Sequence, residues 1–156
     1  MTRRLHQSGK NSVEPGDFPS TGESLISHFQ LLEAILEGTP DPIFAKDAEG
    51  RFILVNSACA AVFGRPRSEV YGRRISELMN SGSACQIELV DAQILATGEP
   101  VTVENALAQN GQPRIYLTTK SPLRNAAGMV IGIVGIARDI TERKRIEESL
   151  YESEAQ

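Results

Sequence analysis

Few residues of this chain have the types and the spacing that catalysis or metal binding requires. The two cysteines, Cys59 and Cys85, lack the spacing of a metal site or of a redox motif. Acid–base catalysis would need an isolated buried carboxylate that faces a tyrosine or a histidine, and Asp91 and Tyr116 are the only candidates. We expect Asp91 on the solvated face of a helix, so the sequence disfavours a small α+β enzyme.

Three glycines, Gly128, Gly132 and Gly135, superficially match a dinucleotide-binding loop. Such a loop must lie between a strand and a helix, whereas these glycines lie within an apolar, strand-like run. We expect them to permit close packing or a bend in a strand.

The composition is that of an ordinary globular domain, with 40% hydrophobic and 23% charged residues in a chain of 156. Its net charge of −4 argues against nucleic-acid binding, since lysine and arginine are scattered among more numerous carboxylates. No signal peptide is visible, and the longest apolar run, Met129 to Ala137, is too short to cross a bilayer. We expect one cytoplasmic domain with reduced thiols and no direct membrane insertion.

The first elements are an arm and a helix. Residues 1–23 are rich in Ser, Gly, Pro and charge and are expected to form a flexible arm. A helix over residues 24–38 follows, because apolar residues recur there at helical spacing, and Gly38 ends it. This apolar stripe, the predicted dimerisation surface, comprises Leu25, Phe29, Leu32 and Leu36.

The core, residues 39–140, is predicted to begin with a hairpin of two strands, Pro42 to Lys46 and Arg51 to Val55. Three helical segments come next, and Asn56 or Ser57 can cap the first. They are expected at Ala58 to Phe63, at Ser68 to Met79 with a break at Tyr71-Gly72, and at Ala84 to Ala96.

After Pro100 the period changes from helical to strand-like. Three strands are expected, at Val101 to Leu107, Arg114 to Lys120 and Met129 to Arg138, before a charged helix over residues 141–156. This order predicts an α+β domain in which one antiparallel sheet carries its helices on one face.

Several segments resemble the PAS family of sensory domains. The segment from Asp41 to Asn56, DPIFAKDAEGRFILVN, is similar to the opening PAS hairpin, and Phe63-Gly64 followed by Ser68 to Gly72 is similar to the helix–turn signature. The most specific stretch, Gly132 to Lys144 (GIVGIARDITERK), resembles the last strand and the exit motif. The resemblance covers roughly residues 25–150 and implies a five-stranded antiparallel PAS fold, flanked by N- and C-terminal helices.

The exit motif Asp139-Ile140-Thr141 is predicted to relay a signal from the core to the last helix. Asp139 or Thr141 can accept orphan backbone N–H groups, and Glu142 stands where a capping box requires it. Ile146 and Leu150, spaced four apart, are typical of a first coiled-coil heptad. The alternative is an ordinary, well-capped C-terminal helix.

The resemblance allows three cofactors to be tested. The flavin members that form a photo-adduct carry a cysteine where this chain has Ile75, which excludes that chemistry. Haem members carry a histidine on the long central helix, but the only histidines here, His6 and His28, precede the core. Non-covalent FAD or a small apolar ligand stays open; no other cofactor and no metal is expected.

Seven residues are predicted to line a cavity, with simple core packing as the alternative: Phe44, Cys59, Val62, Ile75, Leu89, Tyr116 and Thr118. A ligand would be small and largely apolar, oriented by Tyr116 or Thr118. The predicted function is a homodimeric, non-catalytic sensory module that passes a ligand- or partner-induced change to an output domain, such as a histidine kinase or a cyclic-dinucleotide enzyme. A ligand-free interaction module is the alternative.

Overall fold

The computed structural model describes residues 22–156, and the side chains of residues 26–156. Its internal contacts divide the chain into two units, residues 1–34 and residues 35–156. The predicted arm lies outside the described residues except for its last two, which form the start of helix α1 (Gly22–Glu37).

Helix α1 confirms the helix predicted near Ser24. Taken by itself, its first unit presents apolar side chains that are more than half exposed, among them Phe29 at 70% and Leu32 at 59%. The side chain of Leu25 lies outside the described part of the chain, and Leu36, which belongs to the second unit, is half-buried.

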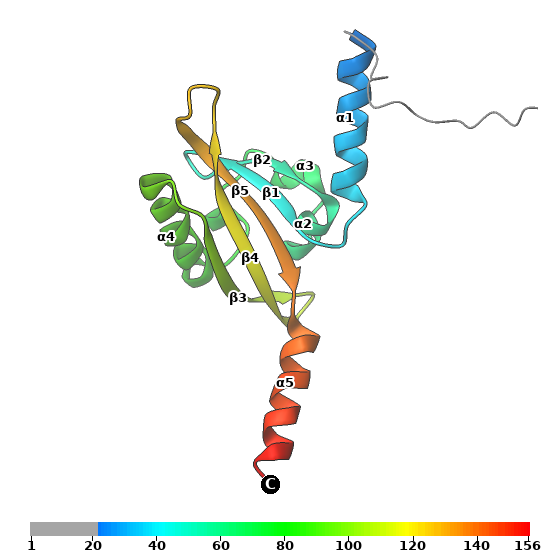
Figure 1. Ribbon diagram of the computed structural model, residues 1–156, viewed down its shortest axis with the longest axis vertical. Helices are drawn as coiled ribbons and strands as arrows, with labels where there is room; N and C mark the ends of the chain where they lie inside the picture. The colour runs from blue at the N-terminus through cyan, green and yellow to red at the C-terminus, as the bar shows by residue number, and fades with distance from the viewer. Residues whose placement is uncertain (1–21) are drawn as a thin grey trace, which may run out of the picture. The chain divides into compact units, whose positions relative to one another are not determined.

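The second unit is built on one five-stranded antiparallel sheet in the order β2-β1-β5-β4-β3 (Figure 1). Its strands are β1 (Ile43–Asp47), β2 (Phe52–Val55), β3 (Val101–Gln109), β4 (Gln112–Arg124) and β5 (Val130–Asp139). The sheet confirms the predicted fold class, and every predicted strand is present, with β3 and β4 longer than expected.

Four helical segments between β2 and β3 cover one face of the sheet, and together they enclose the core. They are α2 (Ser57–Val62), α3 (Arg67–Val70), the short 3₁₀ helix η1 (Ile75–Glu77) and α4 (Ser81–Thr97). The predicted break at Tyr71-Gly72 separates α3 from η1, where Gly72 adopts a φ of 76° that other residues rarely tolerate.

Asn56, which is fully buried, holds the segment that leads from β2 into α2. Its side-chain oxygen accepts the N–H groups of Cys59 at 2.9 Å and of Ile43 at 3.0 Å. Its amide nitrogen donates to the carbonyls of Leu36 at 2.8 Å and Asp41 at 2.9 Å. One side chain therefore caps α2, as predicted, and also holds the start of β1, so burial of the amide leaves no polar group unsatisfied.

Two glycines of β5 allow close packing against β1. A side chain at Gly135 would collide with the ring of Phe44, and one at Gly132 would collide with the backbone carbonyl of Lys46. The structure confirms packing within a strand for Gly132 and Gly135. For Gly128 the prediction was wrong, because this residue lies in the turn before β5 with a φ of 81°.

The last helix, α5 (Thr141–Glu154), begins directly after β5 and leads away from the sheet (Figure 1). Ile146 and Leu150 are 55% and 58% exposed on it. Across residues 22–156, no helix has the length and apolar character needed to span a membrane.

Candidate ligand cavity and its link to helix α5

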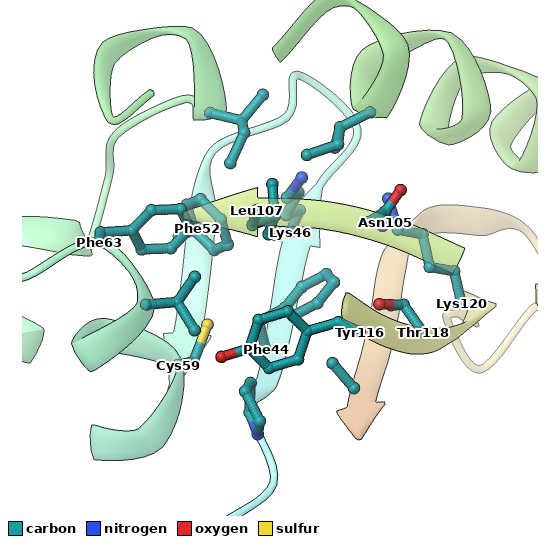
Figure 2. A pocket seen from close by; sticks show the side chains of 15 residues that line it. Phe44, Lys46, Phe52, Cys59, Phe63, Asn105, Leu107, Tyr116, Thr118 and Lys120 are labelled. Atoms are coloured by element: carbon teal, nitrogen blue, oxygen red, sulfur yellow. The ribbon is translucent and has the colours of Figure 1, made fainter. Parts of the chain in front are cut away.

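A cavity of about 60 Å³ lies between the inner face of the sheet and the helices (Figure 2). Alternate residues of β1 and β4 point into it, because successive side chains of a strand face opposite sides. Its walls are formed by Pro42, Phe44, Lys46, Phe52, Cys59, Val62, Phe63, Ile75, Ile87, Asn105, Leu107, Tyr116, Thr118, Lys120 and Ala137.

Six of the seven predicted cavity residues are in this wall; the seventh, Leu89, is not. Leu89 is 67% exposed, so its assignment to the cavity was wrong. Helix α4 turns Ile87, Asp91 and Ile94 toward the core. Two residues along a helix rotate the side chain by about 200°, which places Leu89 on the opposite side from Ile87.

The expectation that Asp91 lies on a solvated helix face was also wrong. Its side chain is 9% exposed. Its carboxylate accepts a hydrogen bond from the ammonium group of Lys46 on β1 at 2.8 Å and another from that of Lys120 on β4 at 2.7 Å. Both lysine side chains are only 2% exposed. We call these three residues the buried charge cluster.

The sequence contains a signal for this cluster that we missed. Lys46 follows Phe44 by two residues, and Lys120 follows Thr118 by two, so both lysines stand at inward-facing positions of their strands. A buried lysine needs a carboxylate partner, and Asp91 lies on the inward side of α4.

The pair that an enzyme hypothesis would require is not formed. Tyr116 donates its hydroxyl hydrogen bond to Gln109, while Asp91 is held by the two lysines. Burial raises the pKa of Tyr116, and it raises the pKa of the Cys59 thiol to about 12. Cys59 is therefore an unreactive thiol at neutral pH.

The cavity wall continues into the base of α5 through strand β4. Tyr116, which lines the cavity, pairs in register with Asp139 at the end of β5. The preceding residue, Ile115, donates its N–H to the Thr141 hydroxyl oxygen at 2.9 Å. The Asp139 carboxylate accepts the Thr141 N–H at 2.9 Å and also the Thr141 hydroxyl.

The predicted capping box at this helix start is not formed. The N-cap position is Ile140, whose side chain makes no capping hydrogen bond, and no hydrogen bond from Glu142 to the backbone of Asp139 is present between these described residues. The Thr141 hydroxyl oxygen instead accepts a hydrogen bond from the backbone of β4. The Asp139 carboxylate accepts the N–H of Thr141, the first residue of α5. The exit motif is thus joined to the sheet more closely than the sequence predicted.

Two ion pairs add to this junction. Arg114 of β4 lies 3.4 Å from the Asp139 carboxylate, and Lys144 of α5 lies 3.1 Å from Glu104 of β3. Partial burial raises the pKa of Asp139, but the hydrogen bonds from Thr141 and the charges of Arg114 and Arg145 outweigh it, so the pKa is lowered overall. Asp139 is therefore ionised at neutral pH.

Comparison with known proteins identifies this architecture. The family model described as the PAS fold matches residues 36–145, which is more than half of the chain. The chain belongs to the PAS family. In this PAS domain, Ile75 stands where the resemblance places the photoreactive cysteine, and it lines the cavity.

Two relatives of this PAS domain are a histidine kinase and a diguanylate cyclase. The methanogenesis regulatory histidine kinase FilI of Methanothrix harundinacea is 35% identical over 126 residues, which is 80% of this chain and 14% of FilI. A diguanylate cyclase of Vibrio cholerae is 29% identical over 127 residues, 80% of this chain and 40% of the cyclase. The chain thus spans less than half the length of each of these relatives.

A solved structure supports the same assignment. The PAS domain of BvgS from Bordetella pertussis is 28% identical, with a TM-score of 0.61, and the match covers 83% of this chain and 98% of that domain. Within the described part of this PAS domain, no three His, Cys, Asp or Glu side chains are grouped so that they could hold a metal ion.

Proposed function

We propose that this PAS domain is a sensory module in which a small molecule in the cavity biases the position of α5 and so regulates an output domain. One observation carries the proposal: residues 114–118 of β4 contribute both to the cavity wall and to the base of α5. A ligand that shifts Tyr116 or Thr118 would act directly on the strand that holds Thr141 and Asp139. Such coupling needs only differential binding to two positions of the helix.

The relatives support the rest of the proposal. Matches to a histidine kinase and to a diguanylate cyclase favour a cytoplasmic signalling protein that carries a separate output domain. We assign binding and relay to this domain and catalysis to the output domain. The net charge of −4 supports neither nucleic acid nor an anionic membrane as a partner.

We propose that the bound molecule is not a chromophore. Helix α4 contains no histidine for haem, and Ile75 replaces the photoreactive cysteine. The purified protein is expected to be colourless. A Soret band, or flavin absorption that persists through gel filtration, would contradict this expectation.

Filling the cavity tests the sensory role. In Thr118→Leu, a larger side chain would occupy space at the cavity wall, where Thr118 is 3% exposed. In the full-length signalling protein, we expect this variant to fold and to lose its response to the stimulus. Output activity with and without the stimulus is the measurement.

The neighbouring residue provides a matched control. Thr119 points to the opposite face of β4, is exposed, and lies 3.3 Å from the hydroxyl of Thr102. Thr119→Leu should therefore keep the stimulus response. A normal response in Thr118→Leu, with its fold intact, would refute ligand sensing and favour a ligand-free interaction module.

We propose that α1 also makes the domain a homodimer. The exposed Phe29 and Leu32 form part of an apolar stripe, and monomers rarely leave such a stripe in water. The double variant Phe29→Asp and Leu32→Asp is expected to be a folded monomer by sedimentation. The substitutions would remove the apolar contact between the two α1 helices, and the introduced carboxylates would repel each other across the interface.

The control for the dimer test is a double variant at polar, exposed positions of the same helix, Ser27→Asp and Gln30→Asp. It adds the same charge and should remain dimeric. Unfolding of the Phe29 and Leu32 variant would instead indicate that the stripe packs within one chain.

A further inference from the structure

The buried charge cluster contains more positive than negative charge. Lys46 and Lys120 bring two ammonium groups to the single carboxylate of Asp91, at 2.8 and 2.7 Å. Removing an ion from water is costly unless an opposite charge compensates it. With one carboxylate for two ammonium groups, one positive charge lacks a counterion within the cluster.

The two lysines are not equally compensated. The Lys46 ammonium lies 4.9 Å from the ring centre of Phe52 and 5.4 Å from that of Phe44, so aromatic faces also stabilise it. Within residues 26–156, the Asp91 carboxylate is the only hydrogen-bond and ion-pair partner of the Lys120 ammonium group. Burial lowers the pKa of Lys120 although Asp91 opposes this shift, which agrees with incomplete compensation.

The ammonium N–H groups that do not bind Asp91 belong to side chains that line the cavity. Both lysines line it, whereas Asp91 does not, and the cavity wall contains no carboxylate. An ammonium group has three donors, and each lysine gives one to Asp91. Figure 2 shows Thr118 beside Lys120, and the Thr118 side chain, which lines the cavity, is only 3% exposed.

Most of the remaining wall is apolar, although Asn105 and Tyr116 also line it. Phe44, Phe52 and Phe63 form a continuous aromatic surface, with ring centres 5.9 and 5.8 Å apart. A cavity of about 60 Å³ suits a molecule of few atoms. The cavity therefore offers ammonium donors that attract a single negative charge and aromatic faces that favour hydrocarbon.

We propose that the cavity binds a small organic monocarboxylate, with its carboxylate at Lys120 and Thr118 and its hydrocarbon part against the phenylalanines. This inference rests on the proposed sensory function and specifies the ligand class. A monoanion is favoured because it balances the one uncompensated charge. It also satisfies the donors of Lys120 and Thr118 in a site where charged hydrogen bonds are strong.

Calorimetric titration with butyrate and its neutral isostere butyramide tests this proposal on the full 156-residue chain at neutral pH. We expect butyrate to bind about tenfold or more tightly than butyramide, because only butyrate forms a charge-assisted bond. In Lys120→Met the two affinities should converge. Lys46→Met, which removes the other cation of the buried charge cluster, provides a second variant if the first does not fold.

Lys144→Met is the matched control, since it removes a lysine that pairs with Glu104 outside the cavity. It should keep the preference for butyrate. Equal binding of butyrate and butyramide to the wild type would overturn the inference, and so would binding of neither probe. Neither result would decide the sensory role, which the Thr118→Leu experiment tests separately.

Discussion

Replacing Asp91 with asparagine is expected to lower the free energy of unfolding by about 3–5 kcal/mol, the usual cost of leaving a buried charge without its partner. The change preserves shape but leaves two ammonium groups, each on a side chain that is 2% exposed, with no carboxylate between them. The asparagine amide can accept from one lysine only, and its NH₂ group would face the other. Chemical denaturation monitored by circular dichroism measures the loss.

The matched variant Lys120→Met is expected to show no loss of stability. It removes one of the two cations, keeps a long apolar side chain, and leaves Lys46 and Asp91 as a balanced pair 2.8 Å apart. Equal destabilisation by Asp91→Asn and Lys120→Met would show that the cluster stabilises the fold as a unit. It would contradict a surplus of positive charge.

Removing the carboxylate of Asp139 should change signalling far more than folding. Loss of a helix cap costs about 1 kcal/mol, which is small beside a domain's ~5–15 kcal/mol of stability. A change of about 1.4 kcal/mol shifts a two-state ratio tenfold, so Asp139→Ala is expected to alter the output ratio several-fold while the sheet remains folded. Asp139→Asn should have a weaker effect, because its side-chain oxygen can still accept the Thr141 N–H.

The lowered pKa of Asp139 sets the pH range of this cap. A carboxyl group whose pKa falls on folding stabilises the folded state above its ordinary value of 3.8, and that contribution is lost as the pH falls through the lowered folded value. The cap is therefore fully present at neutral pH and is lost only in strong acid. A pH-dependent output near neutrality would have to arise from another group.

Local patterns in the sequence predicted most of the fold. The hairpin turn between β1 and β2, the cap at Asn56 and the alternation in β3 and β4 each depend on residues close together in the chain. Phe44, Tyr116 and Thr118 line the cavity, and alternation along β1 and β4 accounts for their inward orientation.

The errors concern contacts between residues far apart in the chain. Apolar residues occur on several sides of α4, so its period did not reveal that Asp91 faces the core and Leu89 does not. The partners of Asp91 lie 45 and 29 residues away. Similarly, Thr141 was considered as an acceptor for N–H groups of α5, but its hydroxyl oxygen accepts the N–H of Ile115, 26 residues earlier.

The most direct test of the relay is the output activity of the full-length signalling protein with and without its stimulus, compared for wild type, Asp139→Ala and Asp139→Asn at equal fold content. Arg143→Ala is the control, since it breaks only the Arg143–Glu147 pair within α5. The relay predicts that Asp139→Ala changes the switching ratio most, Asp139→Asn less, and Arg143→Ala least. An unchanged ratio in Asp139→Ala would contradict it and leave Asp139 as an ordinary helix cap.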